Sequence, residues 1–151
     1  MKSLEFLASH PTFKDFTRDD LTALADQCEE ARFERDQPIF QDEDPGDRMY
    51  IIRSGSVKIY KTVRAFEKTL TVLSAGDVFG EMALLDGQPR SASARALEGS
   101  EAVVLPKAKF FELREKSPKV ALKLMDLLVR FLSQRLRAAN KNLEVISFWI
   151  D

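Results

Sequence analysis

The sequence is poor in the residues that metal and covalent chemistry require. Its 151 residues include one cysteine, Cys28, and one histidine, His10. Zinc and iron sites draw on several His or Cys ligands, and a Ser-His-Asp triad would need His10 as its base with no nucleophile-elbow motif beside it. One cysteine also excludes an intramolecular disulfide. We therefore expect no metal, no cofactor and no enzyme activity.

An excess of charge and long apolar runs are lacking as well. The chain has 23 basic and 24 acidic residues, a net charge of −1 and an isoelectric point near 5.9. A dedicated DNA-binding domain is usually strongly basic, so we expect no direct contact with DNA. No apolar run approaches the roughly 20 residues of a membrane span, and no signal peptide opens the chain. A cytoplasmic location without a membrane span is the default expectation.

Three zones of one domain are present. Residues 1–30 form an N-terminal helical segment, because Thr17-Arg-Asp-Asp20 is a capping box that precedes apolar residues at helical spacing. Residues 31–107 contain short apolar runs separated by Gly, Pro and Asp every 8–12 residues, which is typical of an all-β sandwich or barrel. Residues 108–151 are helical again, and Ser117-Pro118 is a start signal for a long helix. The pattern predicts a mainly β fold with flanking helices.

The long helix carries an apolar stripe. From Pro118 it can run about 30 residues, or roughly 45 Å, which is too long to pack on one small barrel. The stripe has the 4-3-4-3-4 spacing of a heptad seam and consists of Leu132, Leu136, Ala139, Leu143, Ile146 and Ile150. We expect a homodimer through this seam. An amphipathic helix that lies on its own domain is the alternative.

Residues 79–96 contain the groups that a phosphate ester with a ribose would need. Gly80 opens a short helix, whose free amides favour an anion. Arg90 can donate two parallel hydrogen bonds to phosphate oxygens, and Ser91 adds a hydroxyl beside it. Glu81 would repel phosphate, but it is suited to accept from a ribose 2′-OH, as acidic residues do in dinucleotide sites. We call residues 79–96 the cassette.

The cassette resembles the phosphate-binding cassette of the cyclic nucleotide-binding domain family, which includes catabolite activator proteins, protein kinase A regulatory subunits and cyclic nucleotide-gated channels. The similarity rests on residues 79–85 and 89–93, and it extends to turns at 44–47, 55–57 and 75–77. It implies an eight-stranded, jelly-roll-like β-roll with an N-terminal helix and a long C-terminal helix. It also implies a regulatory sensor for cAMP or cGMP, in which the C-terminal helix is repositioned.

The resemblance also assigns residues. Glu81 would bind the ribose hydroxyl and Arg90 the cyclic phosphate. The remaining contacts to phosphate, sugar or base would come from Gly80, Met82, Ala83, Ser91, Ala92, Ile59, Leu70 and Thr71. For the C-terminal helix, alignment of Gln134-Arg-Leu136 places Ala139 and Asn140 at the base, whereas a gapless count points to Arg135 and Leu136. We favour Asn140, which offers both a donor and an acceptor.

Some positions depart from the family. Asp36 and Glu43 stand where the family often has glycine, and Ser93-Ala94 replaces a usual Thr-Val. A β-roll that has lost ligand binding and serves only dimerisation or protein contact is therefore an alternative. A cupin-like metalloenzyme is disfavoured by the single histidine. No helix-turn-helix follows the long helix, so we expect a stand-alone sensor or the sensor part of a larger protein, with an effector protein or fused output domain as partner.

Overall fold

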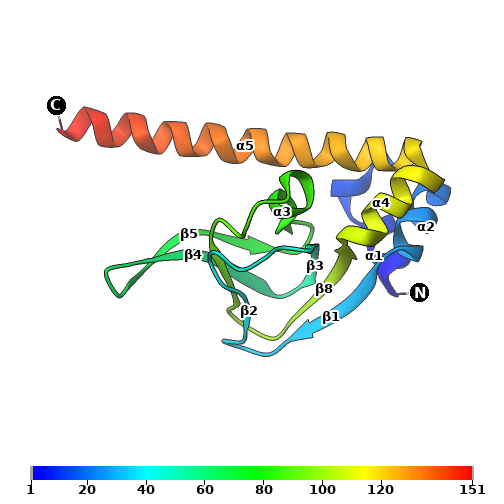
Figure 1. The fold of residues 1–151 in the computed structure, drawn as a ribbon, viewed down its shortest axis with the longest axis horizontal. Coiled ribbons are helices and arrows are strands. Elements are labelled where there is room, and N and C mark those ends of the chain that lie inside the picture. The colour runs from blue at the N-terminus through cyan, green and yellow to red at the C-terminus, as the bar shows by residue number, and fades with distance from the viewer. Residues whose placement is uncertain (1, 151) are drawn as a thin grey trace.

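The computed structural model describes the backbone of residues 2–150, and the side chains of residues 3–82 and 84–142. Three short helical segments come first: α1 (Lys2–Ser9), η1 (Pro11–Phe13) and α2 (Arg18–Asp26). The predicted capping box is confirmed, since Thr17 Oγ1 accepts from the Asp20 amide and the Asp20 carboxylate accepts from the Thr17 amide. These segments gather at one end of the molecule (Figure 1).

Eight strands follow and form two antiparallel four-stranded sheets. The first has the order β1-β8-β3-β6 and the second the order β2-β7-β4-β5. The strands are β1 (Glu29–Phe33), β2 (Pro38–Phe40), β3 (Arg48–Ser54), β4 (Ser56–Val63), β5 (Phe66–Ser74), β6 (Val78–Phe79), β7 (Ser93–Ala96) and β8 (Ser100–Pro106). The predicted eight-stranded, mainly β fold is confirmed.

The sheets enclose an apolar core to which both contribute. Ile52, Val57 and Ala94 are buried between them, and Tyr50 stacks on Phe79 with ring centroids 4.8 Å apart. This aromatic pair stands where β6 leads into the cassette. The core therefore fixes the start of the segment that carries the candidate site.

The C-terminal helices lie over the rest of the molecule. The helix α4 (Lys107–Lys116) leads into α5 (Pro118–Ile150), which starts at the predicted proline. The first half of α5 packs on the N-terminal helices, with Leu124 and Leu128 fully buried and Lys123 Nζ 2.5 Å from Asp20 Oδ2. The second half passes the cassette helix α3 (Glu81–Asp86) and projects beyond the sheets (Figure 1).

Two turns adopt left-handed backbone at the positions where the family often has glycine. Asp36 has φ 66° and Glu43 has φ 74°. This conformation costs a non-glycine residue roughly 1–2 kcal/mol. Glu43, which bears this cost, lies next to the cassette, because its amide donates to the Arg90 carbonyl at 2.9 Å.

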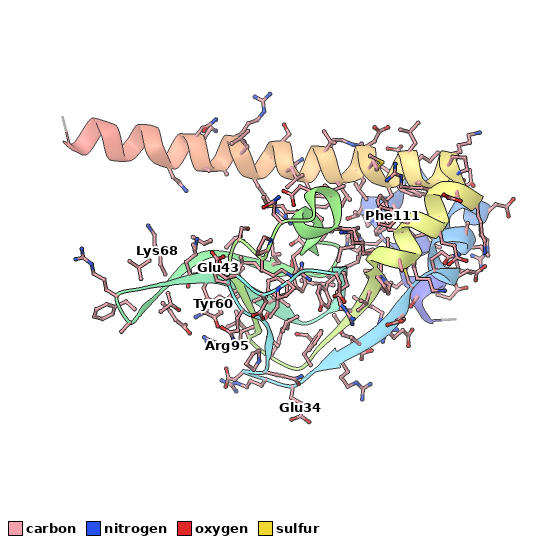
Figure 2. The ribbon with its side chains drawn as sticks, viewed as in Figure 1. Glu34, Glu43, Tyr60, Lys68, Arg95 and Phe111 are labelled. Carbon is pink, nitrogen blue, oxygen red and sulfur yellow. The ribbon has the colours of Figure 1, made fainter. Side chains whose placement is uncertain are left out.

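We expect Glu43→Gly to raise the free energy of unfolding by about 0.5 kcal/mol, because relief of the steric cost exceeds the added chain entropy. Urea denaturation measures the change. Glu34→Gly is the matched control: Glu34 lies in an exposed turn between β1 and β2 (Figure 2) and is not among the positive-φ residues. This control should lose stability. Equal losses in both variants would contradict the assignment of strain to Glu43.

Candidate functional site

The site begins at the junction of β6 and α3. Gly80 forms this junction with φ 78°. A Cβ at this position would stand 2.7 Å from Arg90 Nη1 and 3.3 Å from the Arg48 carbonyl oxygen. Any larger residue would therefore displace the Arg90 side chain, in addition to its backbone strain.

Arg90 is a buried cation that is held in place by backbone oxygens. Its side chain donates from Nη1 to the Gly80 carbonyl at 2.7 Å and from Nη2 to the Arg48 carbonyl at 2.8 Å. The guanidinium also lies 4.2 Å from the centroid of the Phe40 ring. Burial lowers the pKa of Arg90, yet a guanidinium remains charged in proteins. The two bonds use two of its five donors, and the Nε–H has no acceptor among the described residues.

Glu81 is a buried anion that reaches across to α5. Only 2% of the residue is exposed, and its Oε1 accepts from Arg135 Nη1. Arg135 Nη2 also donates to the Val78 carbonyl, so this side chain binds both sides of the β6–α3 junction. Burial raises the pKa of the Glu81 carboxyl, and the charge of Arg135 offsets part of that rise.

A cavity of about 440 Å³ brings most of the predicted site residues together. From the cassette it is lined by Gly80, Glu81, Met82, Arg90, Ser91 and Ala92, from the second sheet by Ile59, Leu70 and Thr71, and from α5 by Arg135 and Ala139. Ala83 lies outside the described side chains. The cavity thus joins a buried cation, a buried anion and an apolar wall between the β-roll and α5.

Asn140, the favoured base contact, does not line this cavity, and its side chain is exposed. Asn142 lines it instead, together with Ala138. Successive helical residues are rotated by 100°, so positions 135, 138, 139 and 142 share a face that excludes 140. Sequence reasoning also missed Phe40, Leu73, Phe79 and Pro89. Phe79 and Pro89 lie inside the cassette, next to Gly80 and Arg90, and this adjacency offered a signal for both.

The part of the chain that the structure describes shows neither a candidate metal site nor a candidate membrane span. It contains no group of three or more His, Cys, Asp or Glu side chains placed to hold a metal ion. No described helix is long and apolar enough to cross a bilayer.

Comparisons with known proteins agree with the observed fold. The family model "Cyclic nucleotide-binding domain" matches residues 30–117. The Cyclic AMP receptor protein of Thermus thermophilus is 34% identical over 139 residues, which are 91% of this chain and 62% of that protein. The chain spans about three fifths of the length of the first curated relatives it matches.

Solved structures give the same result. A cyclic nucleotide-binding domain from Methylobacillus flagellatus superposes with a TM-score of 0.82 at 28% identity, over 93% of this chain and 80% of that one. The cAMP-bound form of an EAL enzyme, Bd1971, is 40% identical with a TM-score of 0.56, over 78% of this chain and 31% of that one. Because the family model covers more than half of the chain and the β-roll is shared, the chain belongs to the cyclic nucleotide-binding domain family.

Proposed function

We propose that this domain is a sensor that binds cAMP or cGMP in the 440 Å³ cavity and that the ligand changes how α5 is held. One observation carries the proposal: Arg90 and Glu81, a buried cation and a buried anion, line the same cavity as a wall of α5. A cyclic nucleotide has the matching groups, namely a phosphate anion, a ribose hydroxyl and a flat apolar base.

Arg90 would bind the cyclic phosphate. Its guanidinium is already positioned by the Gly80 and Arg48 carbonyls, so little side-chain entropy is lost when an anion binds. The donors that these carbonyls leave unused can pair with phosphate oxygens, and such charge-assisted bonds are stronger than neutral ones. Ser91 lines the cavity beside Arg90 and would add its hydroxyl.

Glu81 would accept from the ribose 2′-OH, and this contact would reach α5. The same carboxylate already pairs with Arg135 of α5. A ligand bound at Glu81 would therefore alter the ion pair that holds α5 to the cassette. The helix could then pivot near residues 116–118, where α4 gives way to α5. A ligand shifts such an equilibrium only by the difference of its affinities for the two positions of the helix.

As a regulatory sensor, the domain would catalyse no reaction itself. Its cytoplasmic location stays a prediction. The alternative is a β-roll that has lost ligand binding and acts in protein contact. Two buried charges that line one cavity favour the sensor. The Arg90 Nε–H is buried with no acceptor among the described residues, a cost that a domain without a ligand would bear for no gain. Calorimetric titration separates the two functions, since the alternative predicts no heat from cAMP or cGMP at near-millimolar concentration.

We expect Arg90→Ala to weaken cyclic nucleotide binding about 100-fold, because two charge-assisted hydrogen bonds are lost. Isothermal calorimetry with cAMP and cGMP measures the effect. Arg137→Ala removes the same charge from an exposed position of α5 and should leave affinity unchanged. Parent-like binding by Arg90→Ala would refute the phosphate role.

Glu81 should give stability a distinct pH dependence. Its folded-state pKa lies above the ordinary 4.5, so between these values the folded protein binds more protons than the unfolded chain, and its stability falls as pH rises. We expect the free energy of unfolding of Glu81→Gln to increase relative to the parent from pH 4.5 toward pH 7, as measured by urea denaturation.

Glu112→Gln is the control for this titration. Lys116 holds the pKa of the Glu112 carboxyl below its ordinary value, so the contribution of this group to stability is already complete above pH 4.5. The difference between this variant and the parent should stay flat over the same range. A flat difference for Glu81→Gln as well would show that burial of Glu81 does not govern its ionisation.

The proposed homodimer seam is longer than the sequence stripe. Leu122, Val129 and Leu136 are 60%, 61% and 62% exposed, and Met125 and the half-buried Leu132 continue the same 3-4 spacing. Leu143, Ile146 and Ile150 lie outside the described side chains. Large apolar residues so exposed along one helix indicate an interface, and a second copy of α5 has the same spacing to cover them.

We expect light scattering of the parent to give twice the 17.2 kDa of one chain, because a second helix would cover the stripe. The double variant Val129→Glu/Leu136→Glu should give one chain mass, since it places charges in the seam. Arg137→Glu adds a negative charge on the same stretch of helix outside the stripe and should remain dimeric. A parent of one chain mass at tens of micromolar would contradict the seam.

A further inference from the structure

Met82 is the most exposed methionine among the described side chains. It is 47% exposed, whereas Met125 is 36% exposed and Met49 is fully buried. Met82 also lines the 440 Å³ cavity. A methionine thioether is converted to a sulfoxide where an oxidant can reach the sulfur. Among these three side chains, Met82 therefore combines access for an oxidant with a position at the candidate ligand site.

The sulfur of Met82 contacts a hydroxyl that the proposed function uses. Ser91 Oγ donates to Met82 Sδ at 3.8 Å, and both side chains line the cavity. A thioether sulfur is a weak acceptor, so this hydroxyl can turn to a phosphate oxygen at little cost. A sulfoxide at the same place is polar and carries a strong acceptor oxygen. That oxygen would hold the Ser91 hydroxyl and would bring partial negative charge toward an incoming anion.

We propose that Met82 is a modification site for peroxides and that its oxidation weakens cyclic nucleotide binding, an inference that rests on the proposed function. In the reaction, the sulfur lone pair attacks one oxygen of hydrogen peroxide, the O–O bond breaks and an S–O bond forms. The departing hydroxide takes the proton from the transferred hydroxyl, so the products are the sulfoxide and one water. The thioether loses two electrons and the peroxide gains them.

The single thiol is a poor competitor for the same oxidant. Cys28 is partly buried and packs against the apolar cluster beneath the N-terminal helices. Desolvation, together with the charge of Glu29, raises the pKa of its thiol to about 12. The thiolate is the reactive form of cysteine, and at neutral pH this thiol is protonated. A thioether needs no deprotonation before it reacts, so peroxide should act on Met82 first.

The test compares peroxide-treated with untreated protein, using the whole 151-residue chain. Peptide mapping by mass spectrometry should show that Met82 gains one oxygen atom faster than Met125. Calorimetric titration with cAMP and cGMP should then give an affinity about 10-fold lower than before treatment, the effect of one hydrogen bond to a charged group. The two stereospecific methionine sulfoxide reductases, added together, should restore the original affinity.

Four variants assign the effect, each compared with its own untreated form. Met82→Leu keeps an apolar side chain of similar size but has no sulfur, so peroxide should leave its affinity unchanged. Met125→Leu removes the other exposed methionine, and Cys28→Ser removes the thiol; both should respond to peroxide as the parent does. Ser91→Ala lacks the hydroxyl that the sulfoxide would hold, so its affinity should fall less on oxidation than that of the parent.

The outcomes separate the two proposals. An untreated parent that binds neither cAMP nor cGMP overturns the proposed function, while peptide mapping still decides whether peroxide modifies Met82. Oxidation of Met82 that is no faster than that of Met125 overturns the modification site. Unchanged affinity of the oxidised parent, or an equal loss in Met82→Leu, overturns the effect on binding. Equal losses in Ser91→Ala and the parent overturn the part assigned to the Ser91 hydroxyl.

Discussion

The buried carboxylate of Glu81 is the constraint on which the arrangement of the site depends. An ionised carboxylate taken out of water is costly unless a cation or several donors compensate it. Here the cation is Arg135, which is 54 residues farther along the chain. The desolvation of the Glu81 carboxylate is therefore compensated only when α5 lies across the cassette. The position of α5 is held by this ion pair as well as by the apolar packing of Leu124 and Leu128.

The two charged anchors are stabilised in different ways, and the difference fits their proposed roles. Arg90 is held by the Gly80 and Arg48 carbonyls and the Phe40 ring, all of which belong to the β-roll. Its position does not depend on α5. Glu81 depends on Arg135 and thus on the helix. A phosphate at Arg90 would supply affinity from a fixed frame, whereas a ribose at Glu81 would act on the contact that ties the frame to the helix.

The sequence was sufficient for the parts of the site that are local. Glu81, Arg90 and Ser91 lie within eleven residues, and the glycine and the turn between them determine their approach. The strands β6 and β7 could not be delimited, because two and four residues are too few to show alternation. The choice of Asn140 on α5 has another explanation. Asn140 and Asn142 differ by 200° around the helix, and which of them faces the cavity depends on the direction in which α5 leaves Pro118, a tertiary property. The gapless count placed Arg135 at the base, and its contact with Glu81 was not foreseen.

Two faces of α5 meet at Ala139. This residue lines the cavity and also belongs to the apolar stripe of the proposed seam. On a helical wheel Arg135 and Asn142 lie within about 20° of each other, while Leu132 and Leu136 lie roughly 60° and 100° from Arg135. The ligand face and the seam are therefore adjacent, and Ala139 lies between them at about 40°. A small side chain there would let both a ligand and a second helix approach. Any rotation of α5 that adjusts the contact with Glu81 must rotate the seam by the same angle. Ligand binding and dimerisation would therefore be coupled through one rigid helix. Such coupling would need no chain of contacting side chains between two distant sites.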